Sequence, residues 1–155
     1  MKAKEFLNQV EKLDKLIGNK MIEKEQWKSI AMGVTSGAET VMIHGVAHLP
    51  DKVQSSGNPQ KMADAVARYV DIEAEITEII DRLIDTKQEV ISVIEKLNAI
   101  EYDLLHKVYI QHQTLLDVAI ACERTYSWVT TVHGRALKNV QIILDGMEGE
   151  KNEGK

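Results

Sequence analysis

The most regular pattern of apolar positions in the chain runs from Val66 to Leu97. Apolar residues recur there at alternating steps of three and four, and the residues between them are largely charged or polar. The positions of this seam are Val66, Tyr69, Glu73, Ile76, Ile80, Leu83, Lys87, Val90, Ile94 and Leu97. The spacing predicts one long coiled-coil helix, whose seam must be covered either by the N-terminal helix folding back or by a second copy of the chain.

Residues 2–34 show the same helical spacing of apolar positions, so a second helix is predicted there, with any break or kink expected at Gly18 and Asn19. Residues 35–60 are rich in Gly and Ser and contain both prolines of the chain, Pro50 and Pro59, which predicts a loop. The sequence thus indicates a helical hairpin or coiled coil over its first two thirds.

Shorter helices are predicted beyond Asn98. Thr114 followed by Asp117 has the spacing of a capping box, and Thr125 offers a further N-cap. Residues 146–155 are polar and Gly-rich, which predicts a disordered tail. The expected fold is therefore all-α, with a coiled-coil and oligomerisation region at 1–97, a helix-turn-helix domain at 98–145 and a disordered tail at 146–155.

The segment 117–137 (DVAIACERTYSWVTTVHGRAL) has the layout of two short helices joined by a tight turn. Ala119 is small where the two helices must cross closely, and spacing directs Val118, Cys122, Val129 and Val132 between them. The opposite face of the second helix, which enters a major groove in proteins of this layout, carries Tyr126, Ser127, Thr130 and Thr131.

This segment resembles region 4 of the sigma-70 class. In that class an acidic residue, an aliphatic residue and Ala precede a turn, and a Ser or Thr cap, a Val or Ile four residues later and a closing basic-Ala-Leu follow it. Asp117–Ala119, Thr125, Val129 and Arg135–Leu137 match that pattern without a gap. The stretches 53–73 (VQSSGNPQKMADAVARYVDIE) and 126–138 (YSWVTTVHGRALK) are similar to phage proteins of unknown function grouped with the ArpU and RinA late-transcription regulators. That similarity covers nearly the whole chain.

The resemblance implies a phage transcription regulator whose second helix contacts promoter DNA, with host RNA polymerase as a second candidate partner. Tyr126, Ser127, Thr130 and Thr131 would then face base edges, and Thr125 would meet a phosphate at the helix N-terminus. The residues expected to hold the DNA backbone are Arg124, His133, Arg135 and Lys138.

Two features depart from the family pattern. Glu123 stands where the turn often has Gly, and a left-handed conformation there costs a non-Gly residue about 1–2 kcal/mol. The reading face also lacks the arginines that sigma factors place there, so no bidentate contact to guanine is expected. Base specificity is therefore expected to depend on a dimer or on the polymerase.

The formal net charge of −5 opposes DNA binding as a default, since phosphate neutralisation dominates DNA affinity. Between Arg124 and Leu144, however, Arg124, Arg135 and Lys138 stand without any acidic residue, so the reading helix is locally basic. The single cysteine, Cys122, and the absence of a signal-peptide pattern favour the cytoplasm of a bacterial host cell, with no membrane partner.

No motif for catalysis, for a cofactor or for a metal site stands out, so a non-enzyme without cofactors is expected. The leading interpretation is a promoter-binding regulator that forms a homo-oligomer through Val66–Leu97. Two alternatives stay open. One is a DNA-packaging protein similar to small terminase subunits, although those usually carry the DNA-binding part first. The other is an acidic coiled-coil adaptor that binds proteins and not DNA.

Overall fold

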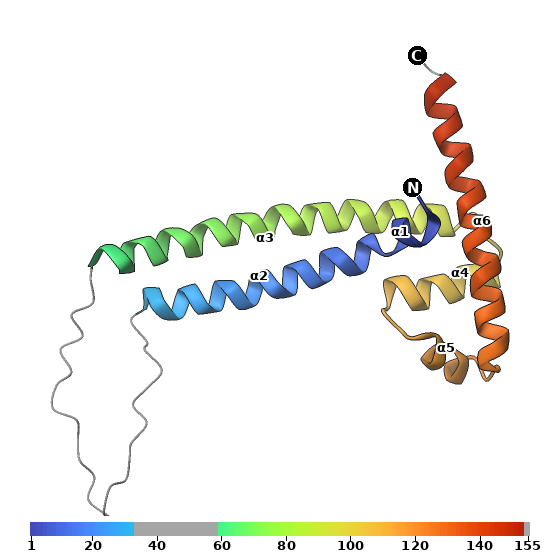
Figure 1. The fold of residues 1–155 in the computed structure, drawn as a ribbon, viewed down its shortest axis with the longest axis horizontal. Helices are drawn as coiled ribbons and strands as arrows, with labels where there is room; N and C mark the ends of the chain where they lie inside the picture. Colours follow the sequence, from blue (N-terminus) through green and yellow to red (C-terminus); the bar gives the residue numbers. More distant parts are fainter. Residues whose placement is uncertain (33–58, 154–155) are drawn as a thin grey trace, which may run out of the picture. The chain divides into compact units, whose positions relative to one another are not determined.

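The computed structural model describes residues 1–32 and 59–153, and over these residues it contains helices and no strand, which confirms the all-α fold class (Figure 1). None of the helices in this part of the chain combines the length and the apolar character needed to cross a membrane. In chain order the elements are α1 (Ala3–Leu7), α2 (Gln9–Ala31), α3 (Pro59–Ile94), α4 (Ala99–Leu105), a π-helical turn (His106–Ile110), α5 (Leu115–Ala121) and α6 (Tyr126–Glu153).

The chain forms two compact units, which divide it differently from the expected boundary after residue 97. The core unit comprises residues 1–17 and 78–155, and the hairpin unit comprises residues 18–77. The N-terminal residues belong to the core unit because α1 contributes Phe6 and Leu7 to its hydrophobic core. The backbone N–H of Ala3 also donates to Oε1 of Gln141 on α6, at 2.7 Å. The C-terminal helices therefore share their core with the start of the chain.

One hydrophobic core holds the core unit together. It takes side chains from α1, the first turns of α2, the end of α3, α4, the π-helical turn, α5 and α6. The buried members are Ala3, Phe6, Leu7, Val10, Val90, Val93, Ile94, Leu104, Leu105, Tyr109, Val118, Ala119, Val129, Val132, Ala136, Val140 and Leu144. Because α6 supplies every third or fourth residue to this core, one face of α6 is fixed inward and the other faces solvent.

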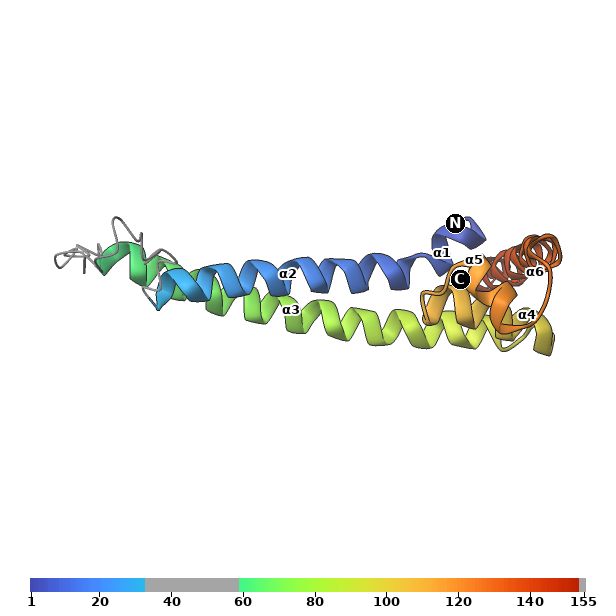
Figure 2. The ribbon, with the colours of Figure 1, turned by 90° about the horizontal axis from the view of Figure 1, so that it is seen from below.

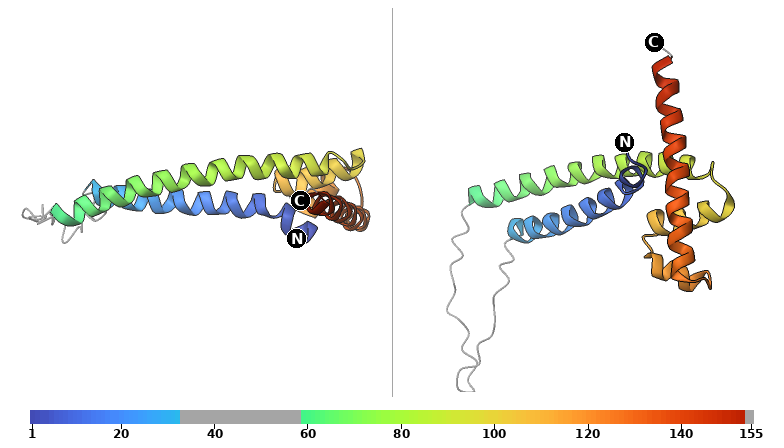
Figure 3. Two further views of the ribbon diagram at one scale, coloured as in Figure 1. Left: turned by 90° about the horizontal axis from the view of Figure 1, so that it is seen from above. Right: turned by 45° about the vertical axis from the view of Figure 1, so that its right-hand side comes forward.

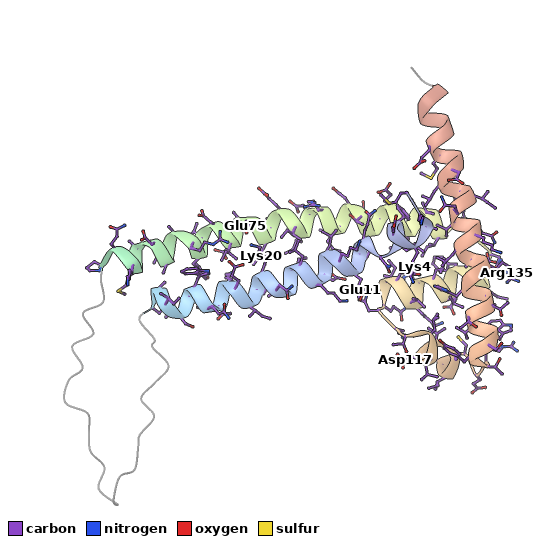
Figure 4. All side chains as sticks on the ribbon, in the orientation of Figure 1. Lys4, Glu11, Lys20, Glu75, Asp117 and Arg135 are labelled. Atoms are coloured by element: carbon purple, nitrogen blue, oxygen red, sulfur yellow. The ribbon has the colours of Figure 1, made fainter. Side chains whose placement is uncertain are left out.

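In the hairpin unit, α2 and α3 run antiparallel and lie side by side in each view (Figures 2 and 3). Ion pairs link the two helices, among them the pair of Lys20 and Glu75 labelled in Figure 4. The pairs are Lys20–Glu75 at 2.6 Å, Lys24–Glu73 at 3.0 Å and Glu23–Arg68 at 3.0 Å. The N-terminal helix thus folds back along α3. This is one of the two alternatives that the sequence left open for packing against the apolar seam.

The register of α3 differs from the predicted seam in the hairpin unit. Ala65 and Ile72 are fully buried there, whereas Val66, a predicted seam residue, is 48% exposed. The seam prediction was wrong by one residue at Val66 and Glu73, because α3 carries a neighbouring apolar stripe that includes Ala65 and Ile72. The seam residues Tyr69 and Ile76 are half-buried. Arg68 bonds Glu75 at 3.0 Å beside the buried stripe, and both residues also form ion pairs with α2. Within the core unit, Val90 and Ile94 of the seam are buried as predicted.

Three expected boundaries also differ. The helix predicted over residues 2–34 is interrupted at Asn8 and continues through Gly18. Most of the loop predicted at 35–60 lies outside the described residues, but α3 already begins at Pro59. A disordered tail is predicted for 146–155; in the structure α6 extends to Glu153, and Met147 packs against the hydrophobic core.

Candidate nucleic-acid interface

The first helix of the predicted helix-turn-helix begins with a complete capping box. The Thr114 hydroxyl oxygen accepts from the backbone N–H of Asp117 at 3.1 Å, and Oδ2 of Asp117 accepts from the backbone N–H of Thr114 at 3.0 Å. The Thr114 hydroxyl also donates to that carboxylate, which is the main reason that the pKa of Asp117 is below its ordinary value. The capping role predicted for Thr114 is confirmed, and it fixes where α5 starts.

The turn after α5 is closed by a Schellman motif. The backbone N–H of Arg124 donates to the carbonyl of Ala119 at 3.0 Å, and that of Glu123 donates to the carbonyl of Ile120 at 3.2 Å. Glu123 has φ 52°, which is the left-handed conformation predicted for this position. The turn therefore has the shape expected of the motif, although the sequence places Glu where Gly is least strained.

The second helix, α6, starts at the predicted cap and packs on α5 as predicted. The Thr125 hydroxyl oxygen accepts from the backbone N–H of Trp128 at 3.2 Å. Val118 and Ala119 of α5 meet Val129 and Val132 of α6 in the hydrophobic core, while Cys122 is half-buried at its edge. This packing orients α6 about its own axis and decides which side chains face outward.

The outward face of α6 gathers most of the residues predicted to contact DNA. Tyr126, Ser127, Thr131, Arg135 and Lys138 are exposed, as are Arg124 and Thr125 just before the helix, and Thr130 is half-buried. The hydroxyls of Thr130 and Thr131 both donate to the backbone carbonyl of Ser127, at 2.9 and 2.8 Å. Those hydroxyls keep their oxygen lone pairs for a partner that donates a hydrogen bond.

Arg135 is tied to the interior of the core unit by its Nε atom. Nε donates at 2.7 Å to Oε1 of Glu101, a carboxylate on α4 that is only 1% exposed. The Asn139 amide donates to both oxygens of the same carboxylate, at 3.1 and 3.0 Å. Burial raises the pKa of Glu101, but the hydrogen bonds from Asn139 and Arg135 outweigh it and hold that pKa below its ordinary value. Glu101 is therefore an ionised group inside the fold.

His133 does not join the outward face. It is half-buried, its Nε2 lies 3.0 Å from the Tyr109 hydroxyl oxygen, and the two rings stack with centroids 5.9 Å apart. Burial lowers the pKa of His133, so the imidazole is neutral at pH 7. The structure thus separates His133 from the other residues predicted to hold the DNA backbone, because its position on α6 points toward the π-helical turn.

Arg124 and Trp128 form a cation-π contact where the turn after α5 leads into α6. The guanidinium carbon of Arg124 lies 5.2 Å from the centre of the Trp128 ring, a cation-π distance. Beside them α4, α5 and α6 enclose a hollow of about 290 Å³ whose lining includes Cys122 and Asp103. Trp128 therefore packs partly against the core and partly under Arg124, and it supports the cation at the start of α6.

Glu101 and Asn139 were not predicted as parts of this site. A signal for Glu101 existed, because it continues the helical spacing of Leu97, Leu104 and Leu105 and so puts a carboxylate among apolar positions. An acid at such a position must be paired, and Arg135 is the basic residue that the fold brings to it. The distance between them along the sequence hides this pairing from any local pattern.

Within the described part of the chain, no group of three or more His, Cys, Asp or Glu side chains is arranged to hold a metal ion. Comparisons of the chain with protein-family models, with curated proteins and with solved structures gave no match. The resemblance to sigma-70 region 4 and to the ArpU and RinA group therefore stays a prediction from the sequence.

Proposed function

We propose that the chain is a phage transcription regulator that binds promoter DNA by placing the N-terminal half of α6 in the major groove. The observation that carries this proposal is the outward face of α6, which combines uncharged hydroxyls with cations and has no acidic residue between Arg124 and Leu144. The opposite face is buried in the hydrophobic core, so the helix is held rigidly in this orientation. A rigid helix with such a face suits recognition in a groove.

The residues of this face divide by chemistry into two roles. Tyr126, Ser127 and Thr131 are short or neutral side chains suited to base edges and to sugar contacts. Arg124, Arg135 and Lys138 are cations suited to phosphates, and the capped N-terminus of α6 adds a positive dipole end near Thr125. His133 has no part in this proposal, because it faces Tyr109.

The net negative charge of the whole chain is compatible with this role because acids are absent between Arg124 and Leu144 and lie instead in other segments, including the hairpin unit. Glu23, Glu73 and Glu75 pair with lysines and Arg68 inside the hairpin unit. A weakly basic face predicts weak binding by one copy. We therefore propose that the regulator acts as a homo-oligomer through α3, using exposed apolar residues such as Val66, with host RNA polymerase as a further partner in the bacterial cytoplasm.

Fluorescence anisotropy with labelled duplexes from phage late promoters tests DNA binding. The affinity should fall with salt at a slope of about −0.9 per neutralised phosphate, and Lys138→Ala should reduce the slope by about one such step. Lys12→Ala is the matched control, since Lys12 is exposed on α2 and outside the proposed interface. Equal slopes for Lys138→Ala, Lys12→Ala and the unmodified chain would contradict the proposal.

The second candidate function, a protein-binding adaptor that does not contact DNA, is favoured by the exposed stripe of Met62, Val66 and Val70 on α3. Light scattering of the Val66→Asp variant measures whether this stripe is needed for self-association. A folded variant of lower molecular mass than the unmodified chain would support self-association through α3, whereas an unchanged mass would contradict it. Oligomer formation without any DNA affinity would favour the adaptor.

A further inference from the structure

The contact between Arg135 and Glu101 leaves part of the guanidinium group open. Arg135 uses only Nε to reach the carboxylate, and no other hydrogen bond of its guanidinium occurs within residues 1–32 and 59–153. Its side chain remains 58% exposed, although Glu101 is 1% exposed. The two terminal nitrogens of Arg135 are therefore available at the outward face of α6, with N–H groups that match two oxygens of one phosphate.

The Glu101 carboxylate is itself firmly placed. Asn139, one turn after Arg135 on α6, donates to both of its oxygens. On α4, the backbone N–H of Glu101 donates to the side chain of the N-cap residue Asn98, at 3.0 Å. Hydrogen bonds thus fix both carboxylate oxygens and the backbone N–H of Glu101. The carboxylate can therefore orient the guanidinium group of Arg135.

From this geometry we infer that Glu101 is a positioning residue for DNA binding, which orients Arg135 so that its terminal nitrogens meet a backbone phosphate. The inference rests on the proposed function and adds to it a residue that never touches DNA. An unrestrained arginine must lose side-chain freedom when it binds, and prior fixing of Nε removes part of that loss. Arg135 then acts as a bidentate phosphate contact that sets the position of α6 along the duplex.

A simple charge effect would have the opposite sign. Glu101 carries a negative charge close to the proposed interface, so removal of that charge alone should strengthen binding to DNA. If Glu101 instead positions Arg135, its removal should weaken binding. The sign of the change in affinity therefore separates positioning from mere electrostatic repulsion.

The experiment compares Glu101→Gln with Asp103→Asn, by anisotropy with the same labelled duplex over a range of salt concentrations. Asp103 is an exposed acid on the same helix, paired with Lys107, so its variant removes one charge without touching Arg135. We expect Glu101→Gln to weaken binding on the order of three- to tenfold and Asp103→Asn to leave it equal or tighter. Glu101→Gln should also lower the salt slope by up to about 0.9, the share of one phosphate.

A double-mutant cycle completes the test. Once Arg135→Ala is present, Glu101→Gln should cause no further loss of affinity, because the residue that it positions is gone. Circular dichroism of each variant, including Glu101→Asp if Glu101→Gln does not fold, establishes that folded chains are compared. Tighter binding by folded Glu101→Gln, or equal losses with and without Arg135, would overturn the inference while leaving DNA binding intact. Absence of DNA binding by the unmodified chain would overturn both proposals.

Discussion

The Tyr109 hydroxyl oxygen lies 3.0 Å from Nε2 of His133, and this contact joins the π-helical turn to the inward side of α6. Both groups are shielded from water: burial raises the pKa of Tyr109 to about 12 and lowers that of His133. The pair is therefore neutral at pH 7, and its hydrogen bond links the π-helical turn to α6 inside the core unit. Its ionisation must cost folding free energy.

The first prediction concerns acid stability. Because the pKa of His133 is lowered in the folded chain, the unfolded chain takes up this proton first as the pH falls below the ordinary value of 6.5. The stability due to neutral His133 is thus present above pH 6.5 and is lost as the pH falls toward the folded-state pKa. Thermal unfolding at several pH values should show this loss, and His133→Gln should reduce it.

Lys4 provides a variant that keeps the histidine. Its charge is the second cause, after burial, of the lowered pKa of His133. Lys4→Ala should therefore make the folded chain less sensitive to acid in the same pH range. Glu101, whose lowered pKa affects stability only below about its ordinary value of 4.5, falls outside this range. An unchanged pH profile in His133→Gln would rule out His133 as its cause.

The second prediction removes only the hydroxyl of the pair. Tyr109→Phe keeps the ring stack with His133 but leaves Nε2 without its partner in the core unit. The expected cost is about 1–2 kcal/mol of unfolding free energy, the usual penalty for an unpaired buried polar group. Urea unfolding at pH 7.5 measures it. Stability equal to that of the unmodified chain would mean that water satisfies the nitrogen.

Local sequence patterns predicted the parts of this fold that depend on neighbouring residues. The caps at Thr114 and Thr125 and the buried face of Val129 and Val132 follow from spacing within one or two turns of helix, and the left-handed conformation of Glu123 follows from the resemblance to the sigma-70 region 4 pattern. Such features need no knowledge of distant contacts, which explains why the turn between α5 and α6 was predicted in detail.

The features that the sequence did not predict arise from contacts between distant segments. Phe6 and Leu7 join a core built largely by residues after 89. Glu101 contacts Arg135, although the π-helical turn and α5 lie between them in the sequence. The inward position of His133 likewise depends on Tyr109, which a helical pattern of α6 alone does not include. In α3, two adjacent apolar stripes fit the same heptad spacing, so the spacing along α3 alone does not tell which of them packs against α2.

The third prediction concerns the strained turn residue. Glu123 has φ 52°, a conformation that costs a side chain with Cβ about 1–2 kcal/mol, whereas Gly adopts it freely. Glu123→Gly should therefore raise the unfolding free energy by up to about 1 kcal/mol, after the greater freedom of Gly in the unfolded chain is subtracted. Glu123→Ala is the control, because it removes the carboxylate and keeps the strain. A Gly variant no more stable than the Ala variant would disprove the effect.

The fourth prediction uses the two apolar stripes of α3. Ile72 is fully buried in the hairpin unit, so Ile72→Ala should cost about 2–4 kcal/mol through lost contacts and a cavity. Val66 is 48% exposed, and Val66→Ala should change stability by at most about 0.5 kcal/mol in a monomeric chain. Thermal unfolding at low protein concentration compares them. A larger loss for Val66→Ala than for Ile72→Ala would restore the seam predicted from the sequence.

The last prediction follows from the hydroxyl of Thr131. That hydroxyl donates to the Ser127 carbonyl at 2.8 Å, so toward DNA it is mainly an acceptor. In the major groove the donors are the N6 amine of adenine and the N4 amine of cytosine. Thr131→Val keeps the shape of the side chain and removes the oxygen.

In binding-site selection from random duplexes, the unmodified chain should therefore favour one of these amine-bearing bases at the position that Thr131 faces. Thr131→Val should lose that preference, with about three- to tenfold lower affinity for the selected site, the value of one hydrogen bond. Thr130→Val is the matched control: its hydroxyl has the same intrahelical bond to Ser127, but the residue is half-buried, so a smaller effect is expected. If Thr131→Val selects the same sites with the same affinity, Thr131 does not read a base, whatever else α6 binds.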